Sequence, residues 1–369
     1  MVSRFTRAVR RLLAIPARRA FQARLDRIPF TLPAERPVLN YGSVLSRTKG
    51  GIVQGGKVKL LHLTGLFPEN ANQFNLLYLV SSAIPPHGLE LARWAKARGV
   101  KLVWNQNGVG FPAWAGAGFE EINRPMRELL RMADYVFYQS AFCQQSATRF
   151  LGEARCGSSL VFNPVDTALF APAKNPPPPS PVRLLTAGTH HQPYRVTSAI
   201  ECLRILREKM DARLTIAGGL RWRGAEAQIK AMVAGLGLEN AVTLHPAYTQ
   251  KEAVALFQDA HFLLHPKFND PCPTVVIEAM ACGLPVIGSA SGGMPELVGE
   301  DGGRLLTPSE QTWERLHPPD PGQMAEAVIE LMQSWPIHSQ AARARAERLF
   351  NKELWVERHR AVFERLTSQ

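Results

Sequence analysis

The stretch FNDPCPTVVIEAMACGLPVIGSASGGMPE, residues 268–296, decides the fold expected for this chain. Four features follow one another along it: an acidic residue (Asp270), a helix that begins at Pro273–Thr274 and carries Glu278, a strand at Pro285–Ser289, and a turn at Gly292–Gly293. A helix that begins directly after a strand presents unpaired backbone N–H groups and the positive end of its dipole. The stretch therefore predicts a phosphate or diphosphate site, with Glu278 one turn into the helix and in reach of sugar hydroxyls.

The order of these residues resembles the donor-binding segment of glycosyltransferase family four, enzymes of the GT-B fold among the glycosyl transferases group 1. In that family a Glu, seven further residues and a second Glu are followed by Ala-Met-Ala-x-Gly-x-Pro-Val and Gly-Gly-x-x-Glu. Here Asp270 stands at the first acidic position and Glu278 at the second, and residues 279–286 and 292–296 follow in register. The carboxylate of Asp270 reaches one methylene less far than a Glu.

Length and composition indicate a globular chain of two domains. With 369 residues it exceeds a typical single core, and 46% hydrophobic with 20% charged residues is ordinary for a folded protein. The five cysteines show no metal-like spacing, and their odd number argues against a disulfide framework. No apolar run has the length of a membrane span, and no signal-peptide core is visible. A cytoplasmic protein, peripheral on the cytoplasmic face of the membrane, is therefore expected.

The formal charge of +12 calls for an acidic partner: anionic lipid, nucleic acid or a phosphorylated substrate. Residues 1–30 hold eight arginines and one aspartate, with apolar residues at helical spacing. This pattern predicts an amphipathic helix on an anionic membrane surface, and a frayed basic tail or a transit peptide are alternatives. Nucleic acid is not expected as a partner, because the basic residues are not interleaved with aromatic ones.

Strand and helix patterns alternate along the chain, which predicts parallel sheets covered by helices. Strands are expected at residues 38–44, 76–80, 100–104, 133–139 and 160–162 and, after a proline-rich run, at 182–187, 213–217, 242–244, 261–265 and 285–289. Combined with the resemblance, this predicts an α/β chain of the GT-B fold, with two doubly wound Rossmann-like domains and a cleft between them. The expected parts are a basic segment (1–33), an acceptor domain (34–171), a Pro-rich linker (172–181), a donor-binding domain (182–349) and a helix that crosses back (350–369).

The resemblance also implies site residues outside the opening stretch. Gly55 and Gly56 match the family's glycine-rich loop, which approaches the donor diphosphate and the acceptor, and where only glycine lets the backbone come that close. After the strand-end Gly188, the family places an Arg and then a Lys that clamp diphosphate. Thr189 takes the first position here and Arg195 the second, with His190 or His191 as a substitute for the missing cation.

Three further positions complete the expected site. Asn105, followed by Asn107, stands where family members often have a histidine near the donor sugar. The backbone amides of Thr274 and Val275 are expected to bind diphosphate. Tyr248 is a candidate for stacking on the base, with surface packing as the alternative.

Together these residues predict a retaining glycosyltransferase that moves a sugar from a nucleotide-diphosphate sugar to a saccharide or lipid-linked hydroxyl acceptor, in surface polysaccharide or glycolipid assembly. Asp270, Glu278 and Asn105 are the expected catalytic residues. The chain has no Asp-x-Asp motif, so no metal or other cofactor is expected. A non-catalytic nucleotide-sugar-binding protein of the same fold is one alternative. A nucleotide-sugar 2-epimerase is another, for which Asn105 offers no acid or base.

Overall fold

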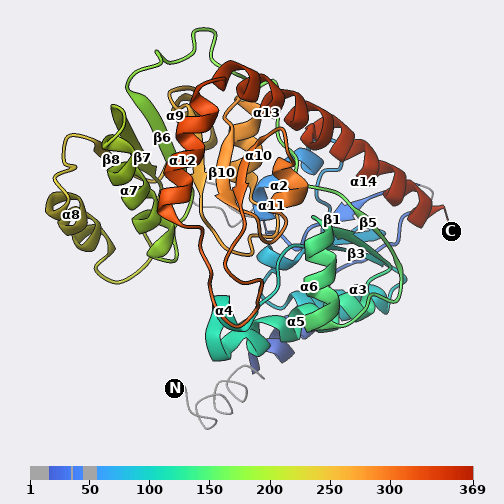
Figure 1. The fold of residues 1–369 in the computed structure, drawn as a ribbon. Coiled ribbons are helices and arrows are strands. Elements are labelled where there is room, and N and C mark those ends of the chain that lie inside the picture. The colour runs from blue at the N-terminus through green and yellow to red at the C-terminus, as the bar shows by residue number, and fades with distance from the viewer. Residues whose placement is uncertain (1–15, 35, 45–55, 369) are drawn as a thin grey trace.

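The computed structural model describes residues 16–34, 36–44 and 56–368 and contains two parallel β-sheets covered by helices (Figure 1). In these residues the first sheet has the order β1-β2-β3-β4-β5 and the second β11-β10-β9-β6-β7-β8. The first sheet consists of β1 (Leu39–Asn40), β2 (Leu76–Val80), β3 (Lys101–Gln106), β4 (Tyr135–Tyr138) and β5 (Gly157–Leu160). The second consists of β6 (Val182–Ala187), β7 (Ala212–Ala217), β8 (Val242–His245), β9 (Phe262–His265), β10 (Val286–Ser289) and β11 (Gly303–Leu306).

The helices alternate with the strands along most of the chain. Those that accompany the first sheet are α2 (Gly56–Thr64), α3 (Gly88–Lys96), α4 (Pro112–Ala115), α5 (Phe119–Met132) and α6 (Ala141–Leu151), with short 3-10 turns at Ser81–Ala83 and Gly116–Gly118. Those of the second part are α7 (Tyr194–Arg207), α8 (Ala225–Gly235), α9 (Gln250–Gln258), α10 (Thr274–Ala281), α11 (Met294–Val298), α12 (Pro321–Met332), α13 (Trp335–Phe350) and α14 (Lys352–Thr367). Residues 16–25 are also helical.

The observed strands agree with the sequence pattern at most positions, and the expected α/β fold with two parallel sheets is confirmed. Three strands differ: β11 was not expected, β5 shares only Leu160 with the strand expected at residues 160–162, and only Leu39–Asn40 of the strand expected at residues 38–44 form β1. The backbone turns away there: Gly42 has a φ of 71°, and the N–H groups of Tyr41 and Ser43 donate to the carboxylate of Glu69 instead of to a neighbouring strand.

The second sheet changes its strand order at β6, which pairs with β7 on one side and with β9 on the other. In such sheets the loops at the carboxyl ends of the two strands separate and leave a crevice for a ligand. The loops after β6 and β9 meet here, since the backbone N–H of Phe268 donates to the hydroxyl of Tyr194 at 3.0 Å. The topology therefore places the opening stretch beside Arg195.

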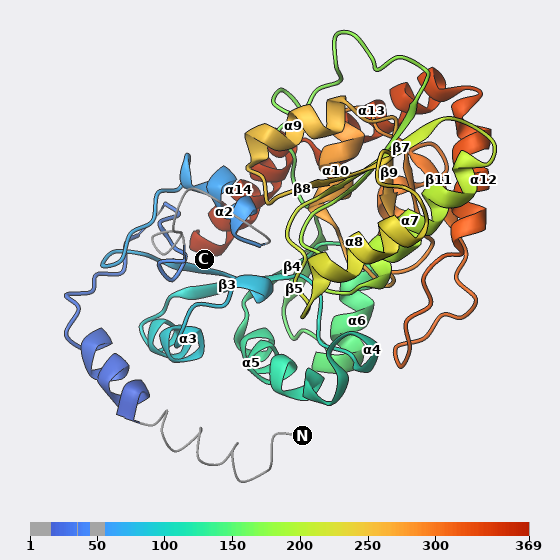
Figure 2. The same ribbon diagram turned by 90° about the vertical axis from the view of Figure 1, so that its left-hand side faces the viewer.

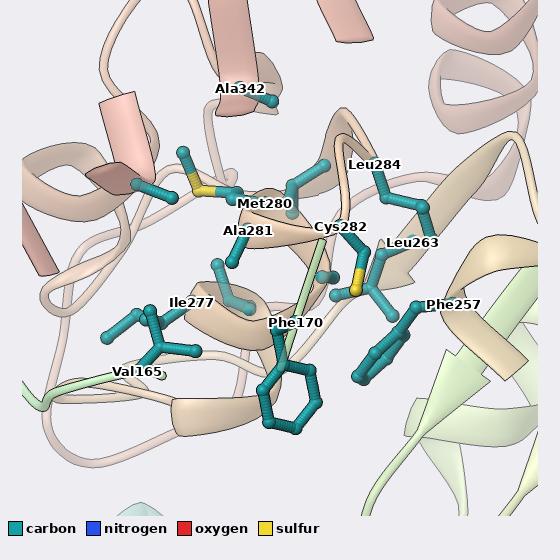
Figure 3. Close-up of a cluster of buried hydrophobic side chains, with 14 of the residues drawn as sticks. Val165, Phe170, Phe257, Leu263, Ile277, Met280, Ala281, Cys282, Leu284 and Ala342 are labelled. Atoms are coloured by element: carbon teal, nitrogen blue, oxygen red, sulfur yellow. The ribbon is translucent and has the colours of Figure 1, made fainter. Parts of the chain in front are cut away.

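Helix α10 is anchored by its apolar side. Ile277, Met280 and Ala281 are fully buried in a cluster that also contains Leu263 of β9 and Ala342 of α13 (Figure 3). Burial of such side chains contributes about 1.5–3 kcal/mol each. This packing holds the start of α10 rigidly against the sheet, while its other side faces the space between the two sheets.

Helix α14 returns to the first sheet, beside α2 (Figure 2). Trp355 and Phe363 are buried in the same cluster as Tyr78 of β2, and the ring of His359 accepts from or donates to the Tyr78 hydroxyl at 3.0 Å. Burial lowers the pKa of His359 to about 3, so the ring is neutral. In the part of the chain that the structure describes, no helix combines the length and the apolar character that crossing a membrane requires.

Candidate functional site

A cavity of about 890 Å³ lies between the two sheets and is lined from both sides. The lining residues from the first part of the chain, here called the N-terminal wall, include Gly56, Lys59, Ser82, Asn107, Phe111, Trp114 and Phe142. Those from the second part, here called the C-terminal wall, include Gly188, Arg195, Tyr248, Lys267, Asp270, Thr274, Val275 and Glu278. Most of the residues singled out in the sequence therefore meet in one cavity, although they come from segments far apart along the chain.

The start of α10 is the first element of the C-terminal wall. Pro273 precedes the helix in an extended conformation, and no side chain caps the first turn. Pro273 accepts from the N–H groups of Val276 and Ile277, one turn further on. Thr274 and Val275 line the cavity, so the amino end of the helix faces it. This is the arrangement that binds phosphate in many proteins, because the helix dipole and the free N–H groups both favour an anion.

Arg195 is the second element, and it is nearly buried, with 6% of its surface exposed. One guanidinium nitrogen, Nη1, donates to the backbone oxygen of Thr189 at 2.8 Å, while Nε has no partner among the described atoms. Burial lowers the pKa of Arg195, and the negative charge of Asp270 opposes that shift. Since a guanidinium stays charged in proteins, the wall holds a cation with free donors.

Glu278 is the third element and has little polar support. Its carboxylate accepts one hydrogen bond, from Nε2 of Gln250 at 3.3 Å. Removal from bulk water raises the pKa of Glu278 to about 8, and the Gln250 contact opposes this only in part. The group is therefore mostly protonated at neutral pH, and hydroxyl groups of a ligand would stabilise its ionised form.

Asp270, by contrast, is fully engaged by its own neighbours. Its carboxylate accepts from Nε2 of His265 at 2.9 Å and pairs with the ammonium of Lys267 at 3.0 Å. Burial alone would raise the pKa of Asp270, but Lys267 and His265 outweigh it and hold the pKa well below its usual value. Because an ionised carboxylate can only accept, the Nε2 atom of His265 carries the proton. Asp270 thus fixes the loop after β9 and the position of Lys267.

The paired glycines of the opening stretch support that same loop from behind. A Cβ atom at Gly292, where φ is 66°, would lie 2.4 Å from the backbone oxygen of Asp270, and one at Gly293 would lie 2.0 Å from that of Pro271. The N–H of Gly293 donates to the Asp270 oxygen at 2.8 Å. Neither glycine lines the cavity, so the motif acts by close backbone packing.

On the N-terminal wall the prominent charged group is Lys59 of α2, which the sequence analysis did not single out. It is 4% exposed, and its ammonium donates to Oδ1 of Asn105 at 2.8 Å and of Asn107 at 3.2 Å. Burial lowers the pKa of Lys59 to about 7. The sequence signal that could have pointed to Lys59 was its spacing, because it falls on the same buried helix face as Leu60 and Leu63.

Asn105 lies behind Lys59 and does not line the cavity. Its amide nitrogen donates to the hydroxyl of Tyr78 at 2.9 Å, and its oxygen accepts from Lys59. The side chain that reaches the cavity from this strand end is Asn107, two residues further on. Direct contact of Asn105 with a donor sugar is therefore not supported by its position.

The remaining predicted residues fall into two groups. Gly56 and Gly188 line the cavity, and a Cβ atom at Gly56 would lie 2.3 Å from the hydroxyl of Ser82. Gly55 lies outside the described residues. His191 lines the cavity, whereas His190 is buried behind it with Nε2 3.2 Å from the backbone oxygen of Ala217. Burial lowers the pKa of His190 to about 3, so it supplies no cation.

The loop between β11 and α12 reaches from the second sheet to α4 (Figure 1), and its Trp313 lines the cavity. Trp313 of this loop stacks on Phe142 with 5.1 Å between ring centroids, and it meets Phe111 edge-on at 5.2 Å. Its backbone oxygen accepts from the N–H of Ala113 at 2.8 Å. A second connection is Glu296, whose carboxylate accepts from the N–H groups of Ala141 and Phe142 at the start of α6.

No three His, Cys, Asp or Glu side chains in residues 16–34, 36–44 and 56–368 are grouped as ligands for a metal ion. All five cysteines are free, and four of them are buried.

Comparison with known sequences identifies the second half of the chain. The sequence model of the family described as Glycosyl transferases group 1 matches residues 170–348. The chain is 30% identical over 145 residues to a D-inositol 3-phosphate glycosyltransferase of Arthrobacter sp. (strain FB24), covering 36% of this chain and 34% of that protein. It is 29% identical over 197 residues to the amylovoran biosynthesis glycosyltransferase AmsK of Erwinia amylovora, covering 50% and 45%. The chain thus spans less than half the length of both relatives.

Solved structures support the fold of the whole chain. Anabaena Alr3699/HepE, solved with UDP-glucose, superposes with a TM-score of 0.70 at 15% identity, covering 89% of this chain and 99% of that one. Sucrose-phosphate synthase from Thermosynechococcus elongatus gives a TM-score of 0.65 at 20% identity, covering 79% and 74%. The chain has the GT-B fold, and its residues 170–348 match the sequence model of the glycosyl transferases group 1.

Proposed function

We propose that this protein is a retaining glycosyltransferase that moves a sugar from a nucleotide-diphosphate sugar to a hydroxyl acceptor. The observation that carries the proposal is the C-terminal wall. There the uncapped start of α10, the buried cation Arg195 and the carboxyl group of Glu278 face one cavity between two sheets. These are the groups that a diphosphate attached to a polyhydroxylated sugar or ribose requires.

In this proposal the diphosphate binds at the amides of Thr274 and Val275 and to the guanidinium of Arg195. Gly188, with a φ of 106° and open space where a Cβ would stand, lets the ligand approach the backbone after β6. Glu278 accepts hydrogen bonds from ligand hydroxyls, which lowers its pKa and releases a proton on binding. Tyr248 lines the cavity beside Glu278 and offers its ring to the base.

Catalysis then rests on electrostatic stabilisation of the departing diphosphate. Asp270 is a poor base, since its carboxylate is held by His265 and Lys267 and its pKa lies below the usual value. In a retaining reaction the acceptor approaches on the face of the leaving group, and the departing phosphate oxygen takes the acceptor proton. No side-chain base is needed, and no metal or other cofactor is proposed. Closure of the two walls would exclude water and limit hydrolysis of the donor.

The acceptor side of the proposal is a saccharide or a lipid-linked sugar, as in assembly of a surface polysaccharide or glycolipid at the cytoplasmic face of a membrane. The relative of Erwinia amylovora is named for biosynthesis of a polysaccharide, which supports this class. The arginine-rich residues 1–30 would hold the protein at an anionic surface, and deletion of residues 1–27 should lower its binding to anionic liposomes. Residues 1–15 of this segment lie outside the described part of the chain, and unchanged liposome binding would remove the membrane assignment.

The test of the activity is a thermal-shift screen with UDP-, GDP- and ADP-sugars, followed by sugar transfer to an acceptor panel. UDP-sugars are tested first, because Anabaena Alr3699/HepE, whose fold is similar, was solved with UDP-glucose. A bound donor raises the melting temperature by mass action, and NMR of the product shows whether the anomeric configuration is retained. Tight binding without turnover on any acceptor would indicate a non-catalytic binding protein, and a 2-epimerised free donor would indicate an epimerase.

A further inference from the structure

Lys59 is a buried ammonium group on the N-terminal wall. The proposed donor site on the opposite wall assigns no role to it. Its hydrogen-bond partners are the amide oxygens of Asn105 and Asn107, both of which are neutral. A buried cation normally has an anionic partner, because removing a charge from water is costly. In the described part of the chain no carboxylate forms an ion pair with Lys59 or shifts its pKa.

The sequence itself excludes such a partner in the neighbouring segment. Residues 45–55, which lead into α2, contain no Asp and no Glu. The titratable groups that affect the pKa of Lys59 are two thiols, Cys272 and Cys143. Burial raises the pKa values of both thiols, so they are neutral at physiological pH. The ammonium therefore lacks a counter-charge among the described residues and in residues 45–55, and burial lowers its pKa to about 7.

The surroundings of Lys59 suit an anion. The residue lies in the first turn of α2, where the helix dipole favours negative charge, and that turn carries no acidic side chain. Gly56, at the start of the same helix, lines the cavity together with the polar side chains of Ser82 and Asn107. The backbone N–H of Asn107 donates to the hydroxyl of Ser81 at 2.8 Å, and its side-chain amide donates to the hydroxyl of Ser82.

We propose that Lys59, Asn107 and the first turn of α2 form an anion site that binds a phosphate or carboxylate group of the acceptor. The site belongs to the N-terminal wall, across the cavity from Arg195 and the start of α10. The inference rests on the proposed function in assigning the donor to the C-terminal wall. It adds the chemical class of the acceptor: a molecule that carries an anionic group beside the hydroxyl that receives the sugar.

The experiment is a calorimetric titration of the full chain with sulfate in the presence of saturating UDP. Sulfate is a tetrahedral dianion whose own charge is constant near neutral pH, and UDP fills the donor wall. Wild type should bind sulfate saturably, and Lys59→Met should bind it at least tenfold more weakly. The matched control is Lys101→Met, a partly exposed lysine of β3 that does not line the cavity, which should bind sulfate like wild type.

A second measurement, made on the wild-type protein, determines the proton uptake that accompanies sulfate binding. An anion raises the pKa of Lys59, so at neutral pH its binding should take up about half a proton, seen as a dependence of the binding enthalpy on the buffer's ionisation enthalpy. This readout remains even if Lys59→Met fails to fold. Equal sulfate binding by wild type and Lys59→Met, no sulfate binding, or no proton uptake would each overturn the proposal.

The same variants separate the two walls. Loss of UDP binding in Lys59→Met, with sulfate binding unaffected, would place the donor's own phosphate at Lys59 and contradict the assignment to the acceptor. If UDP does not bind to wild type, the proposed donor is wrong, and the sulfate titration is then made without nucleotide. In that arm Arg195→Met removes the cation of the opposite wall, so any sulfate binding that remains and depends on Lys59 reports on the proposed site alone.

Discussion

The two walls of the cavity differ in how their charges are supported. On the C-terminal wall Asp270 is paired with Lys267 and His265, and Arg195 lies near that negative charge. On the N-terminal wall Lys59 has only amide partners, and much of the remaining surface is apolar, with Phe111, Trp114 and Phe142. Within the described residues, one wall holds its charges in a preformed network, whereas the other holds an ammonium without a counter-charge.

This difference indicates that the walls have different tasks. A preformed network keeps its geometry whether or not a ligand is present, as suits the clamp for a ligand common to many related enzymes. In the proposed acceptor site, an ammonium without a protein counter-charge would change its protonation when an anionic ligand binds, and would so discriminate between acceptors by charge. The following predictions separate these two tasks and test the links between the walls.

The largest effect is expected for Arg195→Met on the C-terminal wall. Loss of one partner of a buried charge pair costs about 2–5 kcal/mol, so UDP affinity should fall roughly 30- to 4000-fold. Calorimetry with UDP measures this. Arg204→Met, on the same helix in a surface ion pair with Glu201 and Glu208, is the control and should bind UDP like wild type. Equal affinity of Arg195→Met and wild type would remove the clamp from the C-terminal wall.

Glu278→Gln should weaken UDP or UDP-sugar binding roughly 10- to 150-fold, as expected when a charged hydrogen-bond acceptor worth about 1.5–3 kcal/mol is lost. Its ligand-free stability should change in the opposite direction. Folding raises the pKa of Glu278 from 4.5 to about 8, so wild-type stability is lost as the pH rises through this range. The variant has no carboxyl group to ionise and lacks this loss, so its melting temperature should be higher than that of wild type near pH 8.

Thermal unfolding of the Glu278→Gln variant over that pH range, with and without UDP, measures both effects. Glu226→Gln, in an exposed pair with Lys230, is the control and should show neither. A full UDP-induced shift in Glu278→Gln would refute its role toward ligand hydroxyls.

A smaller effect is expected at the aromatic link between the walls. Trp313→Ala removes the stack on Phe142 and the edge contact with Phe111, and should lower the free energy of unfolding by about 2 kcal/mol because Trp313 is only partly buried. The loop at residues 307–320 should become more sensitive to protease. Trp114→Ala, 46% exposed at the same end of the cavity, should cost less. If both variants cost the same, the loop does not hold the walls together.

The smallest effect is expected at the polar link. Glu296→Gln keeps one oxygen for the N–H groups of Ala141 and Phe142 but removes the charge at the start of α6, which should cost about 0.5–1 kcal/mol. Denaturant unfolding measures the loss, and salt should reduce it. Glu300→Gln, exposed in the same part of the second sheet, should leave the midpoint unchanged. An equal midpoint for both variants would show that this cap contributes nothing.

Much of the architecture could be predicted because it depends on neighbours along the chain. The strands at residues 76–80 and 182–187 were expected at their observed bounds, since short apolar runs between turn residues form buried strands. The start of α10 was expected at Pro273–Thr274 for a similar local reason, because a proline disfavours helical geometry at the residue before it. Strand order in the second sheet then brings Arg195 and Glu278 to one cavity.

Other features depend on segments that meet only in the folded protein. Asn105 was expected in the site from its place at a strand end, yet its side chain is taken by Lys59 and Tyr78, which lie 46 and 27 residues away. The cap of Glu296 on α6 spans 155 residues. No local pattern announces such contacts.

By itself the sequence determined most of the two series of strands and helices, the start of α10 and the place of Glu278 on that helix, because turn chemistry and apolar spacing act between neighbouring residues. The tertiary structure alone decided which side chains share the cavity, and it left Lys59 there without an anion. The physical reason is that burial and pairing belong to the assembled walls: the same lysine would be an ordinary exposed cation on an isolated helix.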